Sequence, residues 1–95
     1  MNRFLILAFE YSNAIHYCLI RYKAQTKHNE YAITIMNGEL EKVLFGQHVI
    51  FERDGFLFLE TAGNEVQRIL KEKIAVKLSA FLNIPLKRTK AKTNS

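Results

Sequence analysis

The chain has 95 residues, of which 48% are hydrophobic and 24% are charged, and its formal net charge is +5. This length predicts one small domain with a single core, because a chain of this size buries only about 60–65% of its unfolded surface. One cysteine excludes an intramolecular disulfide.

The positive charge is concentrated at the C-terminus. Residues 1–86 contain ten Lys and Arg against nine Asp and Glu, whereas residues 87–95 contain four basic residues and no acidic one. The last segment also lacks large apolar side chains. We therefore expect a single domain in residues 1–86 and a disordered basic tail in residues 87–95.

The first ten residues place an apolar run behind Arg3, as a secretory leader does. The run covers only residues 4–9 before Glu10 interrupts it, which is too short for a leader or a membrane span. We therefore expect a soluble cytoplasmic protein without membrane contact.

Residues 4–22 are compatible with two structures. They are rich in β-branched and aromatic types, which favours a hairpin that turns at Ser12 and Asn13. Apolar residues also recur at helical spacing, and neither glycine nor proline interrupts the segment, so one amphipathic helix is the alternative. We favour the hairpin.

Residues 31–60 predict a four-stranded antiparallel meander. The dipeptides Asn37-Gly38 and Asp54-Gly55 suit the positive backbone angles of two-residue type I′ turns. The strands are expected at residues 31–36, 39–45, 49–53 and 56–60.

Residues 64–82 predict a helix with a signal at each end. Asn64 is an N-cap residue, and Gln67 stands where a capping box needs it. At the other end Asn83 tolerates the left-handed conformation, and Pro85 prevents continuation of the helix.

This helix has two apolar faces of unequal width. They form either one wide stripe against the core, or two contacts, with the broad face on the sheet and the narrow face on a partner. The broad face contains Leu70, Ile74, Leu78, Phe81 and Leu82, and the narrow one contains Ile69, Val76 and Ala80.

The predicted fold class is therefore α+β, with the meander of residues 31–60 closed by the helix of residues 64–82. Both faces of the last strand are apolar, since Phe56 and Phe58 alternate with Leu57 and Leu59. One helix covers one face, so the second face needs cover. We expect residues 4–22 to supply it, and another molecule is the alternative.

No group of residues predicts catalysis, a metal or a cofactor. Cys18 and three scattered histidines do not supply the close ligand pairs of a zinc site, and His16 is only a nominal base for the thiol. The acidic residues suit solvated strand positions and turns, and there is no glycine-rich phosphate loop.

We therefore predict a small non-catalytic module that docks onto another protein or a second copy of itself. The residues expected at the protein interface are Leu57, Leu59, Ile69, Val76 and Ala80.

The alternative is accessory nucleic-acid binding through basic side chains on phosphates. Aromatic residues are not interleaved with the basic ones along the sequence, which argues against base stacking. The candidate phosphate contacts are Lys73, Lys77, Lys87, Arg88, Lys90 and Lys92.

Overall fold

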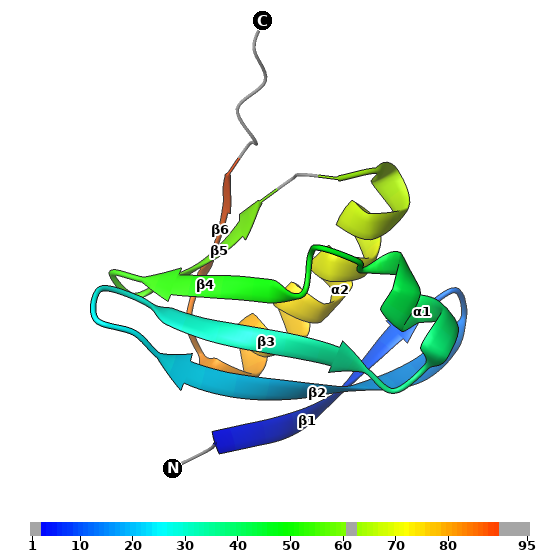
Figure 1. Ribbon diagram of the computed structural model, residues 1–95, viewed down its shortest axis with the longest axis horizontal. Helices are drawn as coiled ribbons and strands as arrows, with labels where there is room; N and C mark the ends of the chain where they lie inside the picture. Colours follow the sequence, from blue (N-terminus) through cyan, green and yellow to red (C-terminus); the bar gives the residue numbers. More distant parts are fainter. Residues whose placement is uncertain (1–2, 61–62, 90–95) are drawn as a thin grey trace, which may run out of the picture.

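The computed structural model of the protein describes residues 3–60 and 63–89, which form one α+β domain (Figure 1). Six strands form a single mixed sheet in the order β1-β2-β3-β4-β5-β6, in which only β5 and β6 run parallel. The elements are β1 (Arg3–Tyr11), β2 (Ala14–Ala24), β3 (Asn29–Ile35), α1 (Gly38–Val43), β4 (Val49–Arg53), β5 (Phe56–Glu60), α2 (Glu65–Leu82) and β6 (Leu86–Thr89).

The N-terminal segment forms the favoured hairpin, but its expected position is wrong. Ser12 and Asn13 make the turn with φ angles of 53° and 61°. Strand β2 then pairs with β3, so the hairpin extends the sheet and covers neither of its faces. By pairing with β3 in the plane of the sheet, the hairpin forms hydrogen bonds with the backbone groups along the edge of β3. A hairpin stacked on the face of the sheet would leave those groups unpaired.

The expected four-stranded meander is also wrong, because residues 39–45 do not form a strand. Asn37 has an extended backbone, with φ −156°, and caps helix α1. Its Oδ1 atom accepts hydrogen bonds from the amides of Glu39 and Leu40, both at 3.1 Å. Asparagine suits both a type I′ turn and an N-cap, and capping prevails here because Leu40 and Val43 pack on the core.

The second expected turn is confirmed between β4 and β5. Asp54 and Gly55 both have positive φ angles, 54° and 83°. Phe51 lies opposite Phe58 in the resulting antiparallel pair.

Helix α2 forms with the caps that the sequence predicts. The side chain and backbone of Asn64 exchange hydrogen bonds with Gln67 in a capping box, and Asn83 closes the helix with φ 57°.

The boundary expected for the tail needs correction, because residues 87–89 belong to strand β6. The amide of Leu57 donates to the carbonyl of Pro85 at 2.9 Å, and Leu57 then pairs with Leu86 in parallel register. Helix α2 supplies the long connection that two neighbouring parallel strands require. Residues 90–95 lie outside the described residues.

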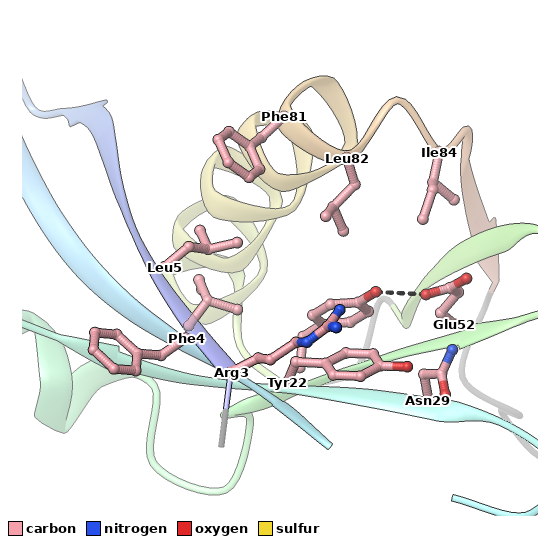
Figure 2. A pocket seen from close by; sticks show the side chains of 11 residues that line it. Arg3, Phe4, Leu5, Tyr22, Asn29, Glu52, Phe81, Leu82 and Ile84 are labelled. Atoms are coloured by element: carbon pink, nitrogen blue, oxygen red, sulfur yellow. Dashed lines mark hydrogen bonds between the residues drawn. The ribbon is translucent and has the colours of Figure 1, made fainter. Parts of the chain in front are cut away.

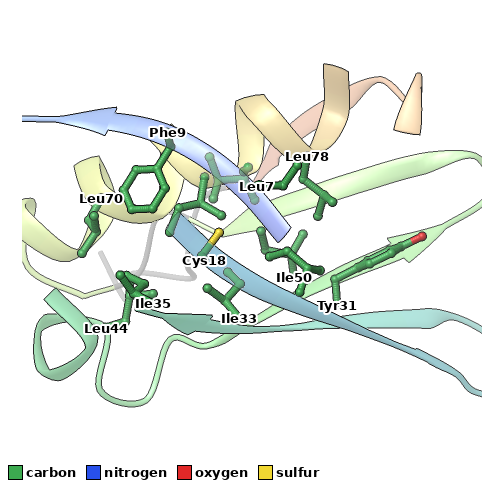
Figure 3. Packing of buried hydrophobic residues seen from close by; sticks show 14 of the residues in the cluster. Leu7, Phe9, Cys18, Tyr31, Ile33, Ile35, Leu44, Ile50, Leu70 and Leu78 are labelled. Carbon is green, nitrogen blue, oxygen red and sulfur yellow. The ribbon is translucent and has the colours of Figure 1, made fainter. Parts of the chain in front are cut away.

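The core lies between α2 and one face of the sheet (Figure 3). Leu70, Ile74 and Leu78 are fully buried against apolar side chains from β1 to β5. The helix contacts β1 at one edge of the sheet and β6 at the other, because the sheet curves around it (Figure 1).

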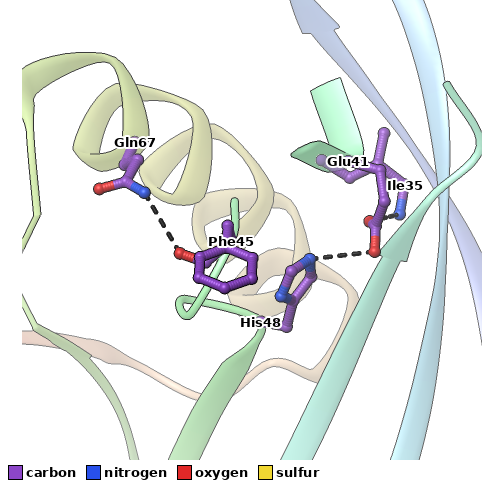
Figure 4. Close-up of polar contacts among 5 residues, drawn as sticks. All are labelled: Ile35, Glu41, Phe45, His48 and Gln67. Atoms are coloured by element: carbon purple, nitrogen blue, oxygen red, sulfur yellow. Dashed lines mark hydrogen bonds and ion pairs between the residues drawn. The ribbon is translucent and has the colours of Figure 1, made fainter. Parts of the chain in front are cut away.

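The loop after α1 is anchored at both ends (Figure 4). The side chain of Gln67 donates to the carbonyl of Phe45 at 3.3 Å, which ties the loop to the start of α2. Glu41 accepts the amide of Ile35 at 2.8 Å, and its other oxygen lies 3.0 Å from Nε2 of His48. Nε2 of His48 is buried and has no hydrogen-bond partner among the described residues, and its contact with Glu41 is an ion pair only if the imidazole is protonated.

Candidate interaction surface

The face of the sheet opposite α2 carries a continuous apolar surface on β1 and β2. Side chains alternate across a strand, so the neighbours of the core residues point to solvent. Cross-strand pairing places Ile6 opposite Leu19 and Ala8 opposite Tyr17. We call this surface the β1–β2 patch, and it consists of Phe4, Ile6, Ala8, Ile15, Tyr17 and Leu19.

The large side chains of the patch are well exposed. Phe4 is 66% exposed, Ile15 59%, Ile6 55% and Tyr17 52%. Four such side chains on two adjacent strands differ from the single exposed apolar residues that are normal on protein surfaces.

The two ends of the patch carry opposite charges. Glu10 pairs with Ile15 at one end, and Arg21 pairs with Phe4 at the other. Both charged side chains are exposed. The patch is therefore apolar along its length, with an acidic end and a basic end.

A second group of side chains, the phenylalanine cluster, occupies the same face on β4, β5 and β6. Phe51 and Phe56 are 42% and 39% exposed, and Phe58 is half-buried. The guanidinium carbon of Arg53 lies 5.2 Å from the ring centroid of Phe58. Nζ of Lys87 lies 5.7 Å from the ring of Phe56 and 5.9 Å from that of Phe58. Aromatic and basic side chains that are separated in sequence thus adjoin in space.

The residues expected at a protein interface are divided between the core and the surface. Leu57 and Leu59 are 0% and 3% exposed under α2, so neither is available to a partner. Ile69 and Val76 are 43% and 46% exposed, and Ala80 is exposed too, all on the outer side of α2.

The candidate phosphate contacts that the structure describes do not gather at one place. Lys73 and Lys77 are exposed on α2, whereas Lys87 lies on the opposite side of the sheet beside the phenylalanine cluster. Arg88 points to the helix side, where its Nε donates to Glu72 at 2.8 Å. Lys90 and Lys92 lie outside the described residues.

The patch residues are not among those that the sequence predicts at a protein interface. The alternation in residues 4–9 does separate Phe4, Ile6 and Ala8 from Leu5, Leu7 and Phe9. Both sets are apolar, however, so alternation could not tell which set faces the core.

Cys18 and His16 lie on the core side of strand β2. Burial raises the pKa of Cys18 to about 11, so its thiol is protonated at neutral pH and is a poor nucleophile. His16 packs against Phe9, with ring centroids 5.8 Å apart. Within the described residues no three His, Cys, Asp or Glu side chains are grouped as a metal site would require.

In the described part of the chain, these features define an α+β domain whose sheet is mostly antiparallel, covered by helices on one face and open on the other. Comparison with protein-family models, curated proteins and solved structures found no match. Neither helix in the described part of the chain has the length and apolar character needed to cross a membrane.

Proposed function

We propose that the protein is a non-catalytic interaction module that self-associates, with the β1–β2 patch of one copy packed against the same patch of a second. The observation that supports this proposal most directly is the exposure of four large apolar side chains, each above one half, on adjacent strands.

The area of the patch is sufficient for a dimer. At about 200 Å² for each large side chain, the four exposed residues offer on the order of 450 Å². Two copies would bury about 900 Å² from these side chains alone, close to the minimum of about 1,000 Å² for a specific interface. The smaller patch members and the charged ends supply the remainder.

The charges at the ends of the patch favour a second copy as the partner. In a symmetric dimer, the two-fold axis would lie between the two sheets and perpendicular to the strands. The strands of the second copy then run in the opposite direction to those of the first. Glu10 of each copy then approaches Arg21 of the other, and the apolar centres coincide. The surface is therefore complementary to itself, as a symmetric interface requires.

Sedimentation equilibrium of the full chain tests this proposal. We expect a concentration-dependent dimer at high micromolar concentration, and we expect Tyr17→Lys to be monomeric because it buries a charge at the centre of the interface. Val76→Lys, which changes an equally apolar exposed site on α2, is the matched control and should remain dimeric.

Two results would contradict the proposal. One is a wild-type chain that stays monomeric at high micromolar concentration. The other is dissociation by Val76→Lys but not by Tyr17→Lys, which would assign the interface to the narrow face of α2.

The phenylalanine cluster favours single-stranded nucleic acid as a second candidate function. Bases stack on aromatic rings and on arginine, and lysine pairs with phosphate, so Phe56, Arg53 and Lys87 offer all three contacts. This candidate site keeps Lys87 from the phosphate contacts that the sequence predicts. It lies on the open face of the sheet, however, and not on α2.

Fluorescence anisotropy with a labelled single-stranded oligonucleotide tests this second candidate. Phe56→Ala and Lys87→Gln should each weaken binding, whereas Lys73→Gln on α2 should not. Equal weakening by Lys87→Gln and Lys73→Gln would indicate diffuse attraction to a basic chain and would refute the cluster as the site.

A further inference from the structure

A pocket of about 680 Å³ lies on the helix side of the sheet, at the C-terminal end of α2 (Figure 2). Its wall is formed by the last turn of α2, by Ile84 after it, and by side chains of β1, β2, β3 and β4. Its volume lies within the range of about 300–1,000 Å³ that is typical of small-molecule sites.

The wall of this pocket is largely apolar and aromatic. Leu5, Leu82 and Ile84 contribute aliphatic surface, and Phe81 projects from the last turn of the helix. Tyr22 and Tyr31 lie side by side on the sheet with ring centroids 5.4 Å apart. A flat ring fits such a wall better than a polar chain does.

One carboxylate stands at the polar end of the pocket. Glu52 is half-buried, and its Oε1 accepts a hydrogen bond of 2.5 Å from the hydroxyl of Tyr31. Burial, and then the hydrogen bond to Glu52 and its charge, raise the pKa of Tyr31, so this hydroxyl remains a donor at neutral pH. Among the described residues no side chain donates to Oε2 of Glu52. A charged acceptor in the pocket wall thus has one oxygen available to a ligand.

We propose that this pocket binds a small molecule in which an aromatic ring is joined by a short chain to an ammonium group. The ring lies against Tyr22, Phe81 and Leu82, and the ammonium group donates to Glu52. A charge-assisted hydrogen bond to a half-buried carboxylate fixes the orientation, and the aromatic faces nearby also favour a cation.

Arg3 distinguishes two sources of this chemistry. It pairs with Tyr22 at the end of β1 and lines the same pocket, where its guanidinium is exposed. A simple arylalkylamine would make no use of Arg3. The carboxylate of an aromatic amino acid would pair with it, in the bidentate geometry that guanidinium groups favour.

Titration of the isotope-labelled full chain, followed by backbone and tyrosine NMR signals, tests the proposal. The probes are phenethylamine, L-phenylalanine and 3-phenylpropionate, which carry an amine, both groups and an acid respectively. We expect saturable shifts at Tyr22, Tyr31 and Phe81 with the first two probes and none with the third. Tighter binding of phenylalanine than of phenethylamine, abolished by Arg3→Gln, would identify the amino acid.

The decisive variant is Glu52→Gln, which keeps an acceptor for Tyr31 but removes the charge. It should weaken both amines by about tenfold or more. Glu65→Gln, which changes an exposed carboxylate in the first turn of α2 outside this pocket, is the control and should leave the affinity unchanged. Absence of saturable shifts with either amine, stronger binding of 3-phenylpropionate, or unchanged affinity in Glu52→Gln would overturn the proposal. Of the patch residues only Phe4 lines this pocket, and the proposed contacts of the ring and the ammonium group do not use it. The Tyr17→Lys monomer should therefore still bind.

Discussion

Lys71 is a charged side chain inside the core. It is 6% exposed, and its Nζ donates a long hydrogen bond of 3.4 Å to Gln47. Burial lowers the pKa of Lys71, and the charge of Glu60 opposes this shift only in part. The folded protein therefore pays a desolvation cost for this ammonium group at neutral pH.

We expect Lys71→Met to raise the free energy of unfolding at pH 7. The pKa of Lys71 is lower in the folded protein than its ordinary value of 10.5, so just below pH 10.5 the unfolded state binds more protons than the folded state. The free-energy cost of burying Lys71 therefore falls as the pH rises through this window. The advantage of the variant should therefore shrink toward pH 10.5. Chemical denaturation of both proteins across this range provides the measurement. Lower stability of the variant at pH 7 would mean that the attraction of Glu60 exceeds the cost of burial.

The two turn glycines that looked alike in sequence should respond differently to substitution. Gly55 has φ 83°, so Gly55→Val should lower the free energy of unfolding by about 1–3 kcal/mol. Gly38 opens helix α1, and a Cβ there would meet no atom within 4 Å. Gly38→Ala should therefore be neutral or stabilising by up to about 1 kcal/mol. Thermal melts that rank the two variants in the opposite order would contradict the helical assignment of residues 38–43.

Among the strands, β6 is short but joins three parts of the molecule. Leu86 packs on the core, Lys87 adjoins the phenylalanine cluster, and Arg88 pairs with Glu72 on α2. The pair is partly exposed and contributes little, so the strand hydrogen bonds and Leu86 carry most of the stabilisation.

Two truncations separate this strand from the residues after it. Removal of residues 86–95 should lower the free energy of unfolding by about 2–4 kcal/mol, through loss of Leu86 packing and of the pairing with β5. Removal of residues 90–95 leaves every described contact in place and should not change the free energy of unfolding. Urea denaturation of the two truncated chains decides the question. Equal stability of both would show that β6 contributes nothing to the fold.

For the molecule as a whole, the main prediction concerns how self-association depends on salt. Apolar burial is not screened as charge is, so the dimer should persist at about 1 M salt, where the screening length is roughly 3 Å. Binding of an oligonucleotide to the phenylalanine cluster should instead weaken steeply. Sedimentation and anisotropy over the same salt range provide the comparison. Loss of the dimer at high salt would refute an apolar interface.

The orientation of the proposed dimer gives a second prediction. Glu10→Lys and Arg21→Glu should each weaken association about two- to fivefold at low salt, because each places like charges together at the rim of the interface. The double variant restores opposite charges and should recover the wild-type affinity. If the double variant is as weak as the single ones, the two copies do not pack with the reversed strand direction.

The candidate surface was only partly predictable. The alternation in residues 56–59 indicated a second apolar face that needs cover, but residues 4–22, which were expected to supply it, extend the sheet instead. A partner contact at Val76 was one of two alternatives, the other being a single wide stripe against the core. The open face proved to be that of Phe56 and Phe58, and the β1–β2 patch lies on the same face. The contact of Lys87 with Phe56 and Phe58 could not be predicted because β6 was not expected.

Local signals were sufficient where the deciding hydrogen bonds span only a few residues. The caps at Asn64 and Asn83 and the turns at Ser12 and Asp54 belong to this group, because each backbone conformation depends on the residue that adopts it.

Long-range contacts decided the rest. Asn37 is compatible with both a turn and a cap until the core selects α1. The N-terminal hairpin and β6 join the sheet because the backbone groups at its edges need hydrogen-bond partners. The sequence of one strand does not determine which strand pairs with it. Leu57 is buried and Phe58 is not because α2 packs on one face of a strand whose two faces are equally apolar.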